Sequence, residues 1–189
     1  MVRDGAAADG PRSDAGLADS VALDASPADG TVADGAVTFV LQAKAFVDGG
    51  KIPATPFTCK GSSYPAGSSP ALSWSGAPIG TQSFALIMDD LTASNWTHWV
   101  YYRIPASASA LPAGDNTSGT LGKEQQGQTR YAGPCPPSGV HTYRFRLFAL
   151  SGTLSKLAAG ATRAQLETAM AQQILAVATL TGTVAKADL

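Results

Sequence analysis

From Ala36 onward, apolar residues come in short runs that are separated by Gly, Pro, Ser and Asn. This alternation of short apolar runs and turn formers is typical of an all-β fold. The predicted strands span residues 37–43, 71–75, 83–89, 98–104 and 143–150. The turn-rich segments 52–70 and 105–137 are expected to be long ordered loops, and loops of this length often carry function.

One helix is predicted near the C-terminus. It begins at Thr162, which has the spacing of a capping box with Gln165, and it ends before Thr181. Apolar residues at helical spacing form a stripe along this helix, which we expect to face the core. The alternative is that the stripe binds a partner protein. The stripe consists of Leu166, Met170 and Ile174.

The first 35 residues have a different composition. They consist largely of Ala, Asp, Gly, Ser and Pro and contain no aromatic residue, so they cannot bury enough surface to offset the entropy of ordering. Asp recurs at every fifth position from Asp4 to Asp34, a period that matches neither a helix nor a strand. We therefore predict a disordered leader or spacer at 1–35 and one folded domain at 36–189. A calcium-binding repeat is the alternative for the leader.

The net charge of the chain also changes sign at the boundary after residue 35. Residues 1–35 hold seven acidic and two basic residues, a net charge of -5, whereas the remainder holds eleven basic and seven acidic residues, a net charge of +4. This mild basic excess favours anionic ligands but is too weak to indicate nucleic-acid binding. No apolar stretch reaches the roughly 18 to 20 residues that span a bilayer, so no transmembrane segment is expected.

The leader and the cysteines bear on the cellular compartment. Acidic low-complexity leaders often follow an export signal or a lipid attachment site in bacterial envelope proteins, which predicts an exported protein, periplasmic or anchored in the outer envelope. Cys59 and Cys135 permit one disulfide in an oxidising compartment, and two buried free thiols are the alternative.

Ionisable residues that could bind a ligand lie at the ends of the predicted strands. If strands 83–89 and 98–104 pair as an antiparallel hairpin, Asp90 leaves the first at the sheet end where His98 enters the second. Alternation places His98 on one face with Val100 and Tyr102, so a contact between Asp90 and His98 is feasible. A structural histidine at a strand end is the alternative.

The second histidine strengthens the case for a site. His141 opens a strand directly after the Gly- and Pro-rich loop 133–139, and Tyr143 lies on the same face by alternation. Together with Asp90 and His98, these residues would form a pocket for an anionic group such as phosphate or carboxylate. The imidazoles and the phenol would donate hydrogen bonds, while the carboxylate orients one histidine.

Enzymatic alternatives use the same residues. Asp90, His98 and His141 have the composition of a metal-binding triad, although no local histidine spacing supports one. A serine hydrolase lacks the Gly-x-Ser-x-Gly elbow. For Cys135, a structural role is favoured over a role as nucleophile, because prolines flank it. We therefore expect no enzyme, no cofactor and no metal.

The ordered part of the chain, from about Phe39 to Val184, resembles the phosphatidylethanolamine-binding protein family, in particular its bacterial Raf kinase inhibitor-like branch. Seven motifs carry the resemblance by their order and combination. They are Phe57-Thr-Cys-Lys-Gly61, residues 69–78, Ser83-Phe-Ala-Leu-Ile-Met-Asp-Asp90, His98-Trp-Val, Ile104-Pro-Ala106, residues 131–139 and His141-Thr-Tyr143.

The resemblance implies a large antiparallel sheet flanked by a smaller one, a C-terminal helix and strand, and a shallow pocket for phosphate-like headgroups. It implies ligand-binding roles for Asp90, His98, Gly133, Pro137, His141 and Tyr143. Members of the family bind phospholipid headgroups, inhibit kinases or proteases, or act as signalling scaffolds. The expected function is therefore non-enzymatic binding of a small anion. An inhibitor that acts through surface loops is the second hypothesis, and a metal-dependent enzyme is the third.

Two departures from the family pattern concern the pocket. Where relatives read Asp-Pro-Asp-Ala-Pro, this chain has Asp90-Leu-Thr-Ala-Ser94 and lacks both prolines and the second acid. We expect the pocket to be intact but its loop to be altered and less rigid. Near the C-terminus, Val184 replaces a common aromatic residue, which predicts a weaker lid.

Overall fold

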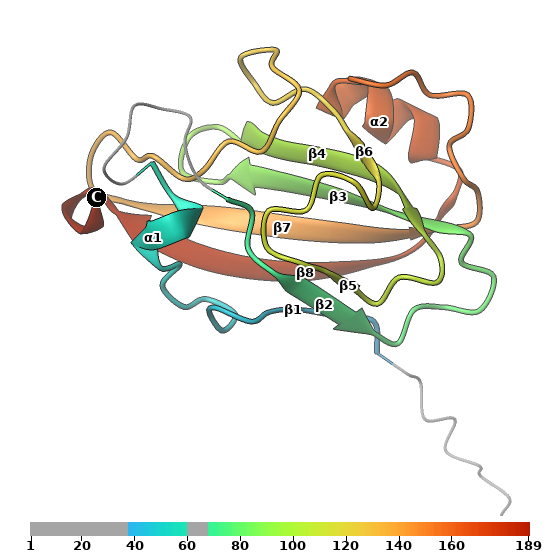
Figure 1. The fold of residues 1–189 in the computed structure, drawn as a ribbon, viewed down its shortest axis with the longest axis horizontal. Helices are drawn as coiled ribbons and strands as arrows, with labels where there is room; N and C mark the ends of the chain where they lie inside the picture. The colour runs from blue at the N-terminus through green and yellow to red at the C-terminus, as the bar shows by residue number, and fades with distance from the viewer. Residues whose placement is uncertain (1–37, 60–67) are drawn as a thin grey trace, which may run out of the picture. The chain divides into compact units, whose positions relative to one another are not determined.

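A computed structural model describes residues 38–59 and 68–189 (Figure 1). The predicted leader at 1–35 lies outside the described residues. Two antiparallel sheets form the body of the fold, one of five strands in the order β6-β4-β3-β7-β8 and one of three strands in the order β1-β2-β5. The predicted mainly β architecture, with a large sheet flanked by a smaller one, is therefore confirmed.

The strands of the large sheet are β3 (Ser83–Asp90), β4 (Trp96–Pro105), β6 (Thr120–Leu121), β7 (Val140–Leu150) and β8 (Ile174–Ala185). Those of the small sheet are β1 (Val40–Ala43), β2 (Leu72–Ser75) and β5 (Ala110–Leu111). The helical elements are α1 (Ala54–Phe57), α2 (Arg163–Met170) and the 3-10 helix η1 (Lys186–Asp188). None of the described helices is long and apolar enough to cross a membrane.

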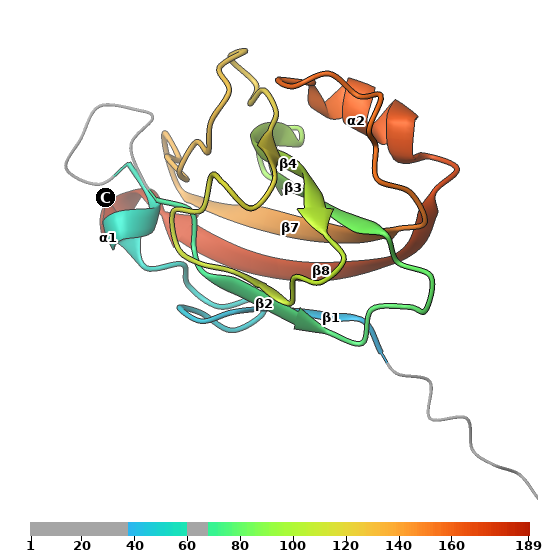
Figure 2. The same cartoon turned by 45° about the vertical axis from the view of Figure 1, so that its right-hand side comes forward.

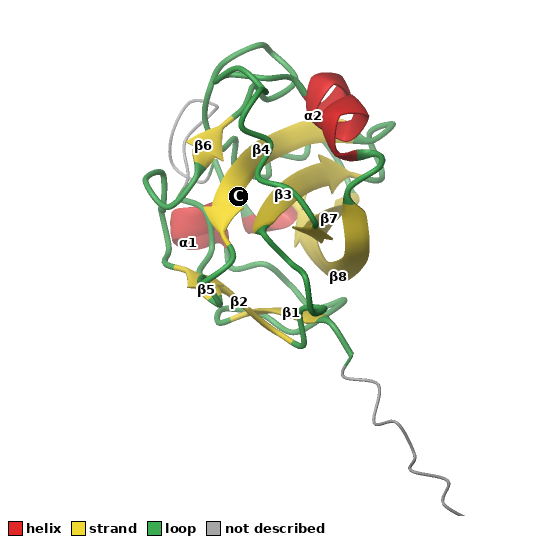
Figure 3. Ribbon diagram, turned by 90° about the vertical axis from the view of Figure 1, so that its right-hand side faces the viewer, coloured by secondary structure: helices red, strands yellow, loops and turns green. Residues whose placement is uncertain are grey.

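The large sheet has a hydrophobic core on each face, because its strands are covered on both sides. The small sheet packs on one face, over a core that includes Phe84, Leu86 and Phe145. Helix α2 packs on the other, over Ile87 and Tyr102 (Figures 2 and 3). Strand β3 is buried along all of its eight residues, as a central strand covered on both faces should be.

Two irregularities in the β3–β4 pairing change the faces predicted by simple alternation. The register shifts once between Phe84 and Leu86 and again between Met88 and Asp89. A β-bulge adds a residue to one strand and re-aims the side chains beside it. The second shift leaves His98 between the pairs Met88–Trp99 and Asp89–Thr97, so His98 does not follow the alternation of Val100 and Tyr102.

The predicted C-terminal helix is correct only in its first half. The capping box of Thr162 and Gln165 is present, but α2 ends at Met170 and the chain enters β8 at Ile174. Ile174 is partly exposed instead of being in the core. Strand β8 is rich in β-branched residues, which favour strands, and it pairs with β7 along its whole length.

A disulfide joins Cys59, just after α1, to Cys135 in the segment 131–139, so the open question of pairing is answered. Two hydrogen bonds reinforce this junction. The N–H of Cys59 donates to the carbonyl of Pro134 at 3.2 Å, and the hydroxyl of Tyr131 donates to the carbonyl of Phe57 at 3.0 Å. The segment 131–139 is thereby fixed to the α1 region.

Replacing both cysteines by serine should lower the free energy of unfolding by about 2 to 5 kcal/mol, because the cross-link closes a long loop in the unfolded chain. Urea denaturation of the oxidised protein and of the Cys59→Ser/Cys135→Ser variant measures this difference. Equal midpoints for the two proteins would show that the cross-link contributes nothing to stability.

Candidate functional site

Asp90 lies at the end of β3 and orients a histidine as predicted, but that histidine is His141 and not His98, for which strand alternation had made a contact feasible. The Nδ1 atom of His141 is 2.6 Å from Oδ2 of Asp90, and both side chains are almost fully buried. The reason is register: Asp90 is opposite Tyr143 on β7, so the carboxylate reaches diagonally to His141 two residues away. The carboxylate therefore sets the orientation of the His141 ring.

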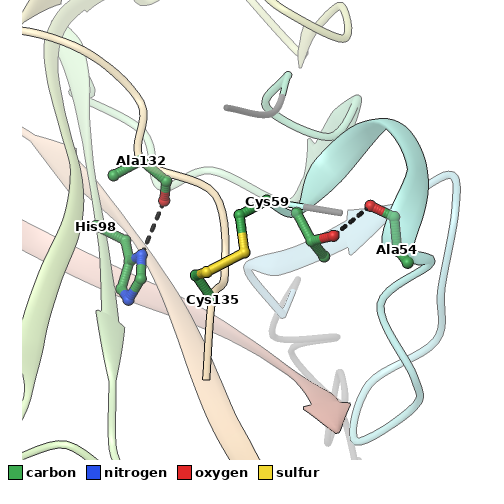
Figure 4. Close-up of a disulfide and its surroundings, with 6 residues drawn as sticks. Ala54, Cys59, His98, Ala132 and Cys135 are labelled. Atoms are coloured by element: carbon green, nitrogen blue, oxygen red, sulfur yellow. Dashed lines mark hydrogen bonds between the residues drawn. A yellow bond between two sulfur atoms is a disulfide. The ribbon is translucent and has the colours of Figure 1, made fainter. Parts of the chain in front are cut away.

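His98 has a different partner, the backbone of the segment 131–139. Its Nδ1 donates to the carbonyl oxygen of Ala132 at 2.8 Å, and the N–H of Ala132 donates to the His98 carbonyl at 2.9 Å. Figure 4 shows His98 beside the segment that carries Ala132 and Cys135. The ring of Trp96 packs against His98 with centroids 4.5 Å apart. Backbone and disulfide thus hold this imidazole in place.

Burial controls the protonation of His98. The residue is 4% exposed, and burial lowers its pKa from 6.5 to about 4. The hydrogen bond to Ala132 and the charges of Asp90, Glu124 and Asp89 act in the opposite direction but are weaker. His98 is therefore neutral at physiological pH, with its proton on Nδ1.

Tyr143 connects the two histidines. Its ring meets the edge of His98 with centroids 5.1 Å apart and stacks with His141 at 6.4 Å. The Tyr143 hydroxyl is buried and makes no hydrogen bond of normal geometry with the described residues, although the Asp90 carboxylate and the Cys135 backbone lie near it. Burial, followed by the charge of Asp90, raises the pKa of the phenol, so the group stays protonated. A buried polar group without a full hydrogen bond costs free energy and calls for an explanation, such as a bound ligand or water.

The remaining predicted site residues lie in the segment 131–139. Gly133 is buried and follows Ala132 directly, whereas Pro137 is exposed. The structure therefore places Asp90, His98, His141 and Tyr143 together and Gly133 next to them, with Pro137 at the surface. The contribution of Ala132 was missed because it comes from a backbone carbonyl, which leaves no signal in the sequence.

The loop after Asp90 is held by hydrogen bonds where the family pattern has prolines. Oδ1 of Asp90 accepts hydrogen bonds from the N–H groups of Thr92 at 2.9 Å and Ala93 at 3.1 Å. The hydroxyl of Thr92 also accepts from the N–H of Thr142 at 3.0 Å, which attaches the loop to β7. Both oxygens of Asp90 are thus used within the protein, which makes Asp90 a positioning residue for His141.

On the other side of the site, Val184 of β8 is fully buried opposite His141.

The neighbouring carboxylate, Asp89, forms a second polar cluster on the opposite face of the sheet. Its side chain is fully buried and within 3.2 Å of three guanidinium groups. These belong to Arg144, Arg146 and Arg163. Sequence reasoning missed this cluster, although an acidic residue and two alternating arginines on neighbouring strands are a detectable signal.

The Asp89 cluster also reaches the loop that leads into the site. Arg163 of α2 donates to the Asn95 carbonyl at 3.1 Å, and Arg144 is 3.5 Å from the Asn95 side-chain oxygen. The loop 91–95 is therefore held by Asp90 at one end and by the arginines at the other.

Two other features bear on what the site can do. Within residues 38–59 and 68–189, no group of three or more His, Cys, Asp or Glu side chains is arranged to hold a metal ion. A groove of about 860 Å³ lies elsewhere, between the small sheet and β8. Apolar side chains dominate it, including Leu41, Phe46 and Leu180, so it does not share the chemistry of the candidate site.

Replacing Asp89 by Asn should lower the free energy of unfolding by roughly 3 kcal/mol, because it leaves partly buried guanidinium groups without a counter-charge. Urea denaturation measures the loss. Glu167→Gln is the matched control, since Glu167 binds two of the same arginines but is 37% exposed; its loss should stay below about 1 kcal/mol. Equal losses would contradict the assignment of Asp89 as the centre of the cluster.

The lowered pKa of His98 predicts a pH-dependent stability. Between pH 6.5 and about 4 the unfolded histidine binds a proton that the folded one does not. Stability should therefore fall as pH falls through this range, by up to roughly 3 kcal/mol. Denaturation at several pH values measures the slope, which His98→Asn should reduce. An NMR titration that places the His98 pKa near 6.5 would refute this account.

Comparisons with known proteins show which family this chain resembles. The chain matches the family model described as phosphatidylethanolamine-binding protein over residues 42–185. A UPF0098 protein of Methanothermobacter thermautotrophicus is 41% identical over 150 residues, which cover 75% of this chain and 95% of that protein. A Mycobacterium tuberculosis protein named "Putative lipoprotein LppC" is 36% identical over 153 residues, 78% of this chain and 73% of that protein.

Solved structures show the same fold. The phosphatidylethanolamine-binding protein homologue CT736 of Chlamydia trachomatis is similar with a TM-score of 0.71 and 34% identity, over 78% of this chain and 97% of that one. Escherichia coli YbcL, described as a member of the mammalian PEBP family, has a TM-score of 0.67 and 28% identity, over 78% of this chain and 98% of that one. The chain belongs to the phosphatidylethanolamine-binding protein family.

Proposed function

We propose that the chain is a non-enzymatic binding protein whose pocket takes a small anionic group of the phosphate type. The proposal rests on one observation above all, the buried Tyr143 hydroxyl, which makes no hydrogen bond of normal geometry with the described residues. The ring that carries this hydroxyl contacts two imidazole rings, those of His98 and His141, with centroid-to-centroid distances of 5.1 and 6.4 Å. An oxyanion accepts a hydrogen bond from a phenol.

The arrangement of the other polar groups supports binding more than catalysis. Nδ1 of His98 donates to Ala132, and Nδ1 of His141 faces Asp90. Each ring therefore directs only its Nε2 atom at a ligand. A general base needs a nucleophile or a water to act on, and Cys135 does not supply a thiol nucleophile, since it is in a disulfide. The site is suited to recognising a group and holding it.

We further propose that the protein works outside the cytoplasm, in the bacterial envelope. A disulfide between Cys59 and Cys135 is stable in an oxidising compartment. The lipoprotein name of the mycobacterial relative and the acidic composition of residues 1–35 support the same location.

Titration with inorganic phosphate or phosphoethanolamine should shift the NMR resonances of His98 and His141 together. Tyr143→Phe should weaken binding roughly ten-fold, since it removes a buried donor to a charged acceptor. Tyr102→Phe is the matched control, because its hydroxyl bonds to the Ala158 carbonyl on the face covered by α2. It should leave the affinity unchanged.

Two outcomes would reject the proposal. One is the absence of any shift in either histidine at millimolar phosphate and phosphoethanolamine. The other is equal affinity of the wild-type protein and Tyr143→Phe, which would place the anion elsewhere.

A further inference from the structure

Strand β8 lies at the margin of the large sheet and pairs with β7 along its inner edge (Figure 3). Near the C-terminal end of β8, the segment 48–52 covers the outer edge. The N–H of Gly49 donates to the Thr181 carbonyl at 3.0 Å, and the Asp48 carboxylate accepts from the N–H of Thr181 at 2.7 Å. The covered part of this outer edge therefore begins at Thr181.

The outer edge is open over residues 176–180. In an antiparallel strand, the N–H and C=O groups of alternate residues point to opposite edges. Thr181 uses the outer edge, so Thr179 and Val177 direct their backbone groups there as well. No hydrogen bond from another described residue reaches these groups. At the start of the strand, a register shift in the β7–β8 pairing interrupts the regular edge before residue 176.

The side chains along this edge do not protect it from pairing. Monomeric proteins shield edge strands with charged residues, prolines or bulges. Strand β8 contains no charged residue and no proline, and its register shift lies only at its start. Leu175 and Val177 are large and apolar, yet they are 42% and 44% exposed. Such an edge is suited to pairing with a further strand.

A second copy of the same chain fits this edge by symmetry. The open stretch 176–180 is centred on Ala178, so a two-fold axis at Ala178 lays the stretch antiparallel against itself. Val177 of each copy then lies opposite Thr179 of the other, and the two residues exchange both of their N–H···O=C bonds. Because the stretch carries no charge, the axis brings no like charges together.

The apolar groove beside β8 adds area to the same contact. Thr179 and Leu180 form part of the wall of the groove between the small sheet and β8. A strand added along the edge of β8 would therefore cover apolar lining of this groove as well as the open backbone groups. Burial of apolar area is the main driving force of protein association.

We infer that two copies of this chain associate through their β8 strands, so that two five-stranded sheets become one continuous sheet. Residues 176–180 pair with residues 145–149 of β7, whereas His141 pairs with Val184 near the other end of β8. The inference therefore does not depend on the proposed anion binding.

Sedimentation equilibrium of the full chain, from about 1 µM to about 1 mM, measures the association. The wild-type protein should show a monomer–dimer equilibrium. Val177→Lys should weaken it at least roughly ten-fold, because the change places a charge beside the two-fold axis. Ile79→Lys is the matched control, since it makes the same change of charge at an exposed position between β2 and β3. Its equilibrium should equal that of the wild-type protein.

Amide hydrogen exchange of the wild-type protein locates the contact. As the dimer forms, exchange of the Val177 and Thr179 N–H groups should slow at least roughly ten-fold, because both become bonded to the second copy. Exchange of the Ala178 N–H should change less, since this group points to the inner edge and bonds to β7 in the monomer. This measurement does not depend on whether Val177→Lys folds.

Any one of three results would overturn the inference. The first is a wild-type protein that stays monomeric at about 1 mM; slow exchange of Val177 and Thr179 in that monomer would show that another segment of the same chain covers the edge. The second is a dimer that Val177→Lys weakens no more than Ile79→Lys does. The third is a dimer in which the Val177 and Thr179 amides exchange as fast as in the monomer.

Discussion

Two consecutive carboxylates end the central strand β3, and both must be paired because both are buried. Alternation along the strand sends Asp89 and Asp90 to opposite faces of the sheet. Asp90 binds His141 and the N–H groups of the following loop. Asp89 gathers guanidinium groups from β7 and α2. One dipeptide thus organises the site on one face and attaches the helix on the other.

The site itself depends on two further constraints that act on His98. A β-bulge removes His98 from the regular alternation of β4 and lets its ring lie against Tyr143. The segment that holds its Nδ1 is in turn joined to the α1 region by the disulfide of Cys135. The neutral, correctly oriented imidazole is therefore a product of packing and covalent cross-linking, not of a charged partner.

These contacts give the residues of the site different roles. Asp90 uses both oxygens inside the protein, so it positions His141 and the loop and leaves ligand contact to other groups. His98, His141 and Tyr143 each keep one polar atom that the described protein atoms do not satisfy. In the loop after Asp90, where the family pattern has prolines, hydrogen bonds of Thr92 and Ala93 attach the chain to Asp90 and to β7.

The amino-acid sequence by itself determined the β-rich class, the hairpin that joins β3 to β4, and the four side chains that meet at one end of the sheet. Periodicity and turn chemistry are local, so they can be read without coordinates. Only the tertiary structure decided that Asp90 bonds to His141 instead of His98, because strand register and bulges depend on long-range pairing. It also decided that β8 replaces the second half of the predicted helix, since pairing with β7 along the whole strand outweighs a local helical pattern.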